Sequence, residues 1–247
     1  MRLDAYLAQT GMAPSRTKAQ ELIQSGRVYI KGKRIDKSAY EVDETVQVEI
    51  QPSACTEYVG RGGRKLEAAL DTFCVAVNGK VCADIGASTG GFTDCLLKRG
   101  AKRVYAIDSG SGQLAPNLAA DARVISLENT NARYMDKATL SGESAELVVM
   151  DVSFISQKLL YPAIRTVAAP CADIITLIKP QFEAGRAHLG KNGIVKDEKV
   201  RRAVVEDVIA SAAQFGFESK GVVESPIKGG SGNTEFLLWL KNTAGGA

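Results

Sequence analysis

Paired cysteines are absent from this sequence. Its five cysteines lie far apart, none of them in a C-x-x-C pair, and an odd number at this spacing fits neither a zinc site nor a disulfide framework. We therefore expect no bound metal and, as in a cytoplasmic protein, reduced thiols at Cys55, Cys74, Cys82, Cys95 and Cys171.

Long apolar runs, a large net charge and histidine are also scarce. No run reaches the roughly 18 apolar residues of a membrane helix, and the first residues hold no signal-peptide core, so we expect no membrane partner. The net charge is only +3, from 31 basic and 28 acidic residues, so nucleic-acid binding has to be argued from the distribution of charge. Catalysis of the Ser-His-Asp type would depend on the single histidine, His188.

The 247 residues, of which 45% are hydrophobic, suffice for one large domain and one small domain. A polar stretch around Pro52, over residues 51–60, is typical of a linker. We predict a small domain with its linker over residues 1–58 and a larger domain over residues 59–247.

The first fifty residues have the pattern of a small α+β unit. Apolar residues at helical spacing predict a short helix over residues 3–7 and a second helix that starts after Pro14-Ser15 and ends at Gly26. Residues 28–30, a Lys-Gly-Lys turn and Ile35 predict a hairpin. Partial alternation over residues 42–50 predicts another strand.

Charge in this unit is one-sided. Residues 16–37 hold seven basic and two acidic side chains, whereas residues 41–49 hold four acidic side chains and no basic one. A basic face favours phosphate binding, and a solvated face without a partner remains the alternative on charge alone.

The order of motifs in this unit is informative. Arg-Leu-Asp at 2–4, Ser-Arg-Thr-Lys at 15–18, Gly-Arg-Val at 26–28 and Lys-Gly-Lys at 31–33 resemble a small RNA-binding domain. That domain occurs in a ribosomal small-subunit protein, in some pseudouridine synthases and in tyrosyl-tRNA synthetases. The resemblance implies that RNA phosphates are contacted by Arg16, Lys18, Arg27, Lys31 and Lys33.

Beyond the linker, strand and helix patterns alternate, as in a parallel sheet wrapped by helices. The final strands, at 220–224 and 235–240, are separated only by a glycine-rich loop, which predicts a terminal antiparallel hairpin. The fold class is therefore α/β, a doubly wound sheet that resembles the Rossmann-like sheet of methyltransferases. The other strands are expected at 80–85, 103–107, 123–127, 146–151 and 173–178, and the clearest helices at 64–73 and 198–215.

A glycine-rich loop, Gly-Ala-Ser-Thr-Gly-Gly-Phe at 86–92, follows the first strand of this sheet. Its glycines allow a sharp turn and close approach of a ligand, but it matches neither G-x-G-x-x-G nor a phosphate-binding P-loop. Asp108, at the end of the next strand, can accept hydrogen bonds from both ribose hydroxyls of an adenosine group. This fits a nicotinamide cofactor or S-adenosylmethionine, and a tight turn with an incidental acid remains the structural alternative.

Four charged residues are expected at the carboxyl edge of the sheet, where ligands of open α/β folds bind. They are Lys65, Asp151, Lys179 and Glu235. Each alone is typical of a surface ion pair, but four together are not. A ribose hydroxyl that attacks a sulfonium methyl has to lose its proton, and a buried lysine beside a second cation can take it. We expect Lys179 to be this base, with Lys65 nearby and the two carboxylates orienting the lysines.

The motifs at 84–92, 148–154 (Val-Val-Met-Asp-Val-Ser-Phe), 177–183 (Leu-Ile-Lys-Pro-Gln-Phe-Glu) and 233–236 (Asn-Thr-Glu-Phe) together resemble the TlyA family. These are bacterial rRNA 2′-O-methyltransferases with an FtsJ-like catalytic domain, often labelled hemolysins. The resemblance spans almost the whole chain and implies S-adenosylmethionine as cofactor and ribosomal RNA or ribosomal subunits as substrate. It assigns Lys65, Asp151, Lys179 and Glu235 to a catalytic tetrad. It implies cofactor contacts at Asp84, Gly86, Ala87, Ser88, Thr89, Gly90, Gly91, Phe92, Asp108 and Asn131.

Three other functions were weighed against this enzyme. An rRNA-binding assembly protein with weak or lost catalysis is opposed by the complete tetrad. A hemolysin is opposed by the missing signal peptide, membrane span and basic amphipathic helix. A nicotinamide dehydrogenase is opposed by the loop pattern and the terminal hairpin.

Overall fold

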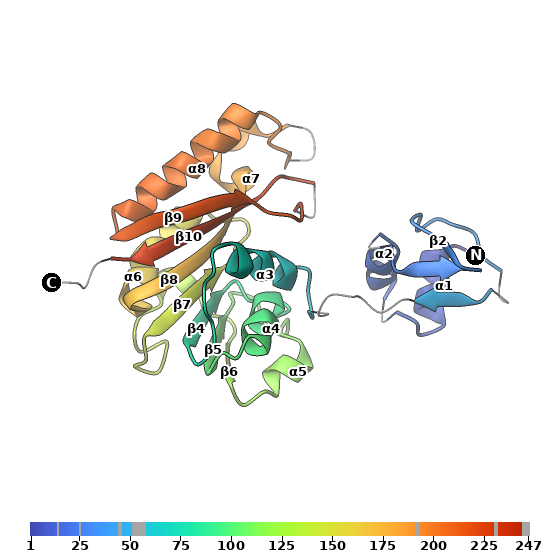
Figure 1. The fold of residues 1–247 in the computed structure, drawn as a ribbon, viewed down its shortest axis with the longest axis horizontal. Helices are drawn as coiled ribbons and strands as arrows, with labels where there is room; N and C mark the ends of the chain where they lie inside the picture. Colours follow the sequence, from blue (N-terminus) through green and yellow to red (C-terminus); the bar gives the residue numbers. More distant parts are fainter. Residues whose placement is uncertain are drawn as a thin grey trace. The chain divides into compact units, whose positions relative to one another are not determined.

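The computed structural model describes residues 1–13, 15–24, 26–43, 46–50, 58–190, 193–229 and 232–243, without the side chains of Lys18, Glu21 and Gln24. The chain divides into two compact units, Met1–Glu57 and Tyr58–Ala247 (Figure 1). None of the helices in the described ranges combines the length and apolar character that a bilayer crossing requires.

The first unit packs two helices against a small antiparallel sheet with strand order β2-β1-β3. Its core contains Leu3 and Leu7 from the first helix, and Ala19 and Ile23 from the second, all fully buried. Gly26, with φ +71°, ends the second helix as expected. The elements are α1 (Leu3–Gln9), α2 (Arg16–Gln24), β1 (Val28–Ile30), β2 (Lys33–Arg34) and β3 (Val48–Ile50).

The strand expected over residues 42–50 is wrong in its extent, because among the described residues of this range only Val48–Ile50 forms a strand. Val42 is buried for a different reason. Its amide donates to the Met1 carbonyl and its own carbonyl accepts from the Met1 amino group, so it packs on the chain start instead of extending the ladder. The alternation of apolar residues thus predicted the burial of Val42 correctly, but it did not predict that Val42 forms its backbone hydrogen bonds with Met1.

The second unit contains a seven-stranded sheet with order β6-β5-β4-β7-β8-β10-β9. Strands β4 to β8 run parallel, while β10 is antiparallel to both β8 and β9. The expected fold class, a doubly wound sheet with a terminal antiparallel hairpin, is therefore confirmed. The strands are β4 (Val81–Ile85), β5 (Arg103–Ile107), β6 (Val124–Leu127), β7 (Ala145–Met150), β8 (Ala168–Ile178), β9 (Phe217–Glu224) and β10 (Phe236–Asn242).

Helices cover both faces of this sheet, with α3, α4 and α5 on one side and α6 and α8 on the other (Figure 1). Alternate residues of β4 serve the two cores: Cys82 packs with the first group, Ala83 and Ile85 with the second. The helical elements are α3 (Gly62–Thr72), α4 (Gly91–Lys98), α5 (Pro116–Ala119), η1 (Ala132–Tyr134), η2 (Gln157–Leu160), α6 (Tyr161–Val167), α7 (Pro180–Glu183), η3 (Arg186–His188) and α8 (Glu198–Ala213).

The strand order places a topological switch point at β4. From β4 the chain moves outward through β5 to β6 and then returns to the other side of β4 as β7. At such a point the loops after neighbouring strands diverge, which opens a crevice beyond their carboxyl ends. The candidate site lies there.

Candidate active site

A pocket of about 400 Å³ lies beyond the carboxyl ends of β4, β5 and β7. This volume is within the range of small-molecule and cofactor sites. Among the predicted residues, the lining includes Gly86 and Ser88 after β4, Asp108 after β5, Asn131 before η1 and Asp151 after β7.

Two glycines of the loop after β4 are required by the local structure. Gly86 has φ +84°, and a Cβ atom there would lie 2.6 Å from the Asp151 carbonyl oxygen. Gly90 has φ +93°, and its Cβ would lie 2.3 Å from Leu118 Cδ1. A side chain at either position would strain the backbone, and at Gly86 it would also push the loop away from the Asp151 backbone at the pocket wall.

Asp108 is held rigidly at the pocket wall. Its Oδ2 accepts a hydrogen bond from the Ser88 amide at 2.8 Å, and its Oδ1 accepts one from the Gly110 amide at 2.7 Å. A carboxylate has about four acceptor sites, so two bonds leave capacity for a ligand's hydroxyl groups. Asn131 also lines the pocket, and its Oδ1 accepts from the Arg133 amide at 3.1 Å, which fixes the side chain.

The remaining predicted cofactor residues, Ala87, Thr89, Gly90, Gly91 and Phe92, are outside the pocket lining. Gly91 and Phe92 begin α4, and Phe92 packs in the core beside α3. Most of the glycine motif, five of its seven residues, thus forms the strand-to-helix turn, while Gly86 and Ser88 line the pocket.

Asp84, the sixth predicted residue outside the lining, is fully buried near the end of β4. Burial raises its pKa to about 7, although the hydrogen bond that its Oδ2 accepts from the Thr93 hydroxyl at 2.7 Å works in the opposite direction. Asp84 therefore shapes the turn from inside the core.

One predicted catalytic pair follows β7 and β8. Lys179 Nζ lies 2.6 Å from Asp151 Oδ1 and donates a hydrogen bond to the Ser153 hydroxyl at 2.8 Å. Both charged side chains are largely shielded, with 12% and 21% of their surface exposed. Asp151 and Ser153 both line the pocket, so these two contacts hold Lys179 Nζ at the pocket rim.

The second predicted pair is more deeply buried. Lys65 Nζ, on α3, donates to Glu235 Oε2 at 2.5 Å, and the two residues are 8% and 2% exposed. Each of these buried charges depends on its partner, because burying either charge without the other would destabilise the fold.

The two pairs lie at the same edge of the sheet. Phe236, the first residue of β10, pairs with Ile178, the last residue of β8. Glu235 directly precedes β10 and Lys179 directly follows β8, so the two residues lie at the same end of this antiparallel pair. At the start of α3, a Cβ on Gly62 would lie 3.8 Å from Asp151 Oδ2, which brings the Lys65 helix beside Asp151. Four residues far apart in sequence thus lie at one edge of the sheet, and Asp151 among them lines the pocket.

Sequence motifs alone did not single out two residues beside the pair. Ser153 binds Lys179, as described above. Phe154 lines the pocket, is 90% exposed and has φ +64°, and its ring centroid lies 5.1 Å from that of Phe182. An exposed phenylalanine in a conformation that L residues rarely adopt points to function rather than packing. The signal in the sequence was an aromatic residue directly after a candidate catalytic strand end.

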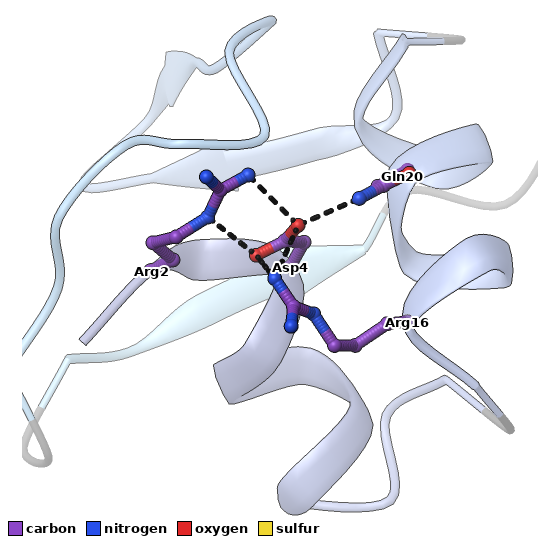
Figure 2. A network of polar contacts seen from close by, with 4 residues as sticks. All are labelled: Arg2, Asp4, Arg16 and Gln20. Atoms are coloured by element: carbon purple, nitrogen blue, oxygen red, sulfur yellow. Dashed lines mark hydrogen bonds and ion pairs between the residues drawn. The ribbon is translucent and has the colours of Figure 1, made fainter.

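The first unit holds an arginine pair fixed by one buried acid (Figure 2). Asp4 is fully buried and accepts hydrogen bonds from Arg2 at 3.1 Å, Arg16 at 3.3 Å and Gln20 at 2.7 Å. These bonds, the Arg2 bond first among them, hold the pKa of Asp4 far below its usual range. The Arg2 and Arg16 side chains remain 50% and 57% exposed, so their charges face solvent in a fixed arrangement.

Of the other predicted RNA-binding residues, Lys31 and Lys33 are exposed at the β1–β2 turn, and Arg27 is half-buried just before β1. The side chain of Lys18 lies outside the described part of the structure. Arg2 belongs to the Arg-Leu-Asp motif but was not predicted to bind RNA, and its order comes from its hydrogen bonds to Asp4.

Known proteins share both units. Residues 58–242 match the FtsJ-like methyltransferase family, and residues 1–48 match the S4 domain. The chain is 46% identical over 239 residues to a candidate rRNA methyltransferase, YqxC, of Bacillus subtilis, covering 97% of this chain and 85% of the relative. It is 45% identical over 240 residues to the 16S/23S rRNA (cytidine-2′-O)-methyltransferase TlyA of Mycobacterium tuberculosis, covering 97% and 89%.

A solved structure from Streptococcus thermophilus, described as a candidate hemolysin, has a TM-score of 0.79 and 40% identity. The match covers 99% of this chain and 89% of that chain. This chain is thus similar both to relatives with methyltransferase names and to a relative with a hemolysin name. The chain belongs to the TlyA family, in which an S4 domain precedes an FtsJ-like methyltransferase domain.

Proposed function

We propose that this enzyme transfers a methyl group from S-adenosylmethionine to a ribose 2′-hydroxyl of ribosomal RNA. The observation that carries the proposal is the Lys179–Asp151 pair at the rim of a cofactor-sized pocket, with the buried Lys65–Glu235 pair beside it. Relatives named as rRNA methyltransferases, including a cytidine-2′-O enzyme, support the choice of substrate.

The pocket fits an adenosine-containing cofactor. Gly86 allows close approach of the backbone, Asp108 offers a fixed carboxylate for ribose hydroxyls, and Asn131 offers an amide for the base. S-adenosylmethionine, when bound, supplies an electrophilic methyl group on a sulfonium.

Lys179, in its neutral amine form, is the proposed proton acceptor. The 2′-hydroxyl has to lose its proton as it attacks, and Lys179 Nζ is held at the pocket rim by Asp151 and Ser153. Asp151 stabilises the ammonium that the transfer produces. Glu235 orients Lys65 in the same way, which keeps a second positive charge beside the reacting oxygen.

RNA recognition is shared between two surfaces. Arg2 and Arg16, fixed by Asp4, and the exposed Lys31 and Lys33 are proposed to contact phosphates. The exposed Phe154 ring offers a stacking surface for a base next to the reacting ribose. This requires a splayed nucleotide, because a 2′-hydroxyl within a helix is hard to align with the pocket. A ribosomal substrate would place the protein in the cytoplasm.

The test is transfer of labelled methyl from S-adenosylmethionine to purified bacterial 30S subunits, 50S subunits and naked rRNA. We expect label on a ribose 2′-oxygen of at least one of these substrates. Absence of label on all three, from protein shown by circular dichroism to be folded, would instead favour an rRNA-binding protein without catalysis.

The role of the S4 domain is tested by salt dependence. Replacing Arg16, Lys31 and Lys33 by alanine should weaken RNA binding and reduce the slope of log affinity against log salt by roughly one per lost phosphate contact. An unchanged slope would remove these residues from the RNA interface.

A further inference from the structure

Glu183 joins the two segments that form the rim of the pocket. It is the last residue of α7, the short helix that directly follows Lys179. Its Oε2 accepts a hydrogen bond from the Ser156 hydroxyl at 2.6 Å, and its Oε1 accepts one from the backbone amide of Gln157 at 2.8 Å. One carboxylate therefore binds the end of the loop that follows β7 and carries Asp151, Ser153 and Phe154.

This loop has little backbone support of its own. Within the described residues, no amide from Val152 to Ile155 donates to a backbone carbonyl. Phe154 sits in the middle with φ +64°, a backbone conformation that is strained for any residue with a Cβ atom, and its ring is exposed, so burial does not hold it. Side-chain contacts must therefore maintain the conformation, and Glu183 makes two of them.

Glu183 binds at the point where the loop enters the core. Gln157 is 1% exposed, and its Oε1 accepts hydrogen bonds from Thr176 at 2.5 Å and Tyr161 at 3.4 Å. The Gln157 side chain is therefore anchored to the sheet and α6, while the backbone amide of Gln157 is anchored to α7 through Glu183. The same helix supplies Phe182, the ring that contacts Phe154.

We propose that Glu183 is a positioning residue that holds the loop of residues 152–157 against α7, and so presents the Phe154 ring to a base of the RNA substrate. The inference rests on the proposed function for its RNA partner. Glu183 itself takes no part in proton or methyl transfer. It acts through Ser156 and Gln157, and its contribution appears in RNA binding.

The first test compares Glu183→Ala, Glu183→Gln and Glu143→Ala in methyl transfer to the ribosomal subunit that the wild type labels. Glu143 is the matched control, because it also accepts two side-chain hydrogen bonds, from Arg103 and Tyr105, and Arg103 begins β5 at the opposite edge of the sheet. We expect Glu183→Ala to raise KM for the subunit roughly tenfold, the loss of about one charge-assisted hydrogen bond. The value of kcat and the affinity for S-adenosylmethionine should stay within about twofold.

Glu183→Gln should keep KM close to the wild-type value, because the side-chain oxygen of the introduced glutamine can still accept a hydrogen bond from the backbone amide of Gln157. In a Phe154→Ala background, Glu183→Ala should add less than about twofold, because both act through the same ring. An equal loss from Glu183→Ala with and without Phe154 would overturn the proposal, as would a fall in kcat with KM unchanged.

Hydrogen exchange gives a readout that does not depend on activity. Glu183→Ala should speed exchange of the Gln157 and Lys158 backbone amides, which donate to Glu183 Oε1 and Ser156 Oγ, by roughly tenfold or more, and Glu143→Ala should leave them unchanged. Unchanged exchange in Glu183→Ala would overturn the proposal whatever the methylation assay gives. If the wild type transfers no methyl, the proposed function fails, and the exchange comparison still decides whether Glu183 holds the loop.

Discussion

The two edges of the central sheet both carry lysines bound to carboxylates. At the carboxyl edge, Lys179 binds Asp151 and Lys65 binds Glu235. Toward the amino ends of the parallel strands, Asp173 accepts from Lys241 at 2.8 Å, Lys80 at 3.0 Å and the Trp239 indole at 3.0 Å.

The difference lies in what surrounds the charges. Asp173 is 6% exposed and has three donors around one carboxylate, so its cluster joins β4, β8 and β10. At the carboxyl edge, Asp151 borders a pocket, and Lys179 also binds a serine of the pocket wall. A cluster of lysines and acids alone therefore does not point to an active site, whereas a cluster beside a pocket at a topological switch point is a candidate for one.

Two aromatic pairs, one beside the Asp173 cluster and one at the pocket, differ in the same way in their surroundings. Phe73 and Trp239 lie with ring centroids 5.8 Å apart and are both partly buried beside the Asp173 cluster. Phe154 and Phe182 lie 5.1 Å apart, with Phe154 almost fully exposed at the pocket. The first pair has the environment of a packing contact, and the second has the environment of a binding surface.

The largest expected effect separates the lysines of the two edges. Lys179→Ala should lower kcat for methyl transfer by about 10²- to 10⁴-fold, the usual contribution of a general base, with cofactor affinity nearly unchanged. Lys241→Ala should leave kcat within about twofold and lower the melting temperature. Steady-state kinetics and thermal unfolding check both, and undiminished turnover in Lys179→Ala would remove it as the base.

The next effect separates carboxylates at the two edges. Asp108→Ala should weaken S-adenosylmethionine binding by roughly ten- to a hundredfold, because charge-assisted hydrogen bonds to the ribose are lost. Asp121, which binds Arg123 at 2.7 Å just before β6, is the control, and Asp121→Ala should leave affinity unchanged. Isothermal titration measures both, and equal affinities would sink the ribose role of Asp108.

A smaller effect separates the aromatic pairs. Phe154→Ala should weaken binding to the methylated subunit about tenfold, consistent with loss of one base stack, with little change in unfolding free energy. Phe73→Ala should do the reverse, lowering the unfolding free energy by roughly 1–3 kcal/mol and leaving RNA affinity intact. Filter binding and urea denaturation distinguish them, and the same loss in both variants would contradict the contrast.

The smallest effect is a difference in pH dependence between two buried acids. Burial raises the pKa of Asp84 to about 7, so the folded state keeps a proton that the unfolded chain releases. Its contribution to stability therefore falls as pH rises from about 4 to 7. Asp84→Asn should remove this decline, on the order of 1 kcal/mol or more, in urea denaturation at pH 5 and 7.5.

Asp173 should show the opposite slope. Burial raises its pKa, but hydrogen bonds from Lys241, Lys80 and Trp239 outweigh burial and lower it overall. Its contribution is present above about pH 4 and is lost as pH falls through the lowered pKa. Asp173→Asn should therefore cost roughly 1–3 kcal/mol at neutral pH and less in acid, and a cost independent of pH would contradict this assignment.

Much of the fold followed from local patterns. Buried strands at residues 81–85 and 103–107 were predicted closely, because a short, largely apolar run bounded by turn residues is typical of a buried strand. β8 begins at Ala168, five residues before the strand expected at 173, because Val167 ends α6 and the chain continues directly into the sheet. Such a boundary depends on pairing with β7, which no local pattern records.

The sequence by itself determined the fold class, the family and the position of the four charged residues beside strand ends or a helix start, because periodicity and short motifs are local. Only the tertiary structure decided which lysine binds which acid and which glycines line the pocket. It also decided that Asp4 fixes two arginines and that Glu183 holds the Phe154 loop. These contacts join residues separated by up to 170 positions, so they depend on strand order and packing geometry instead of sequence spacing.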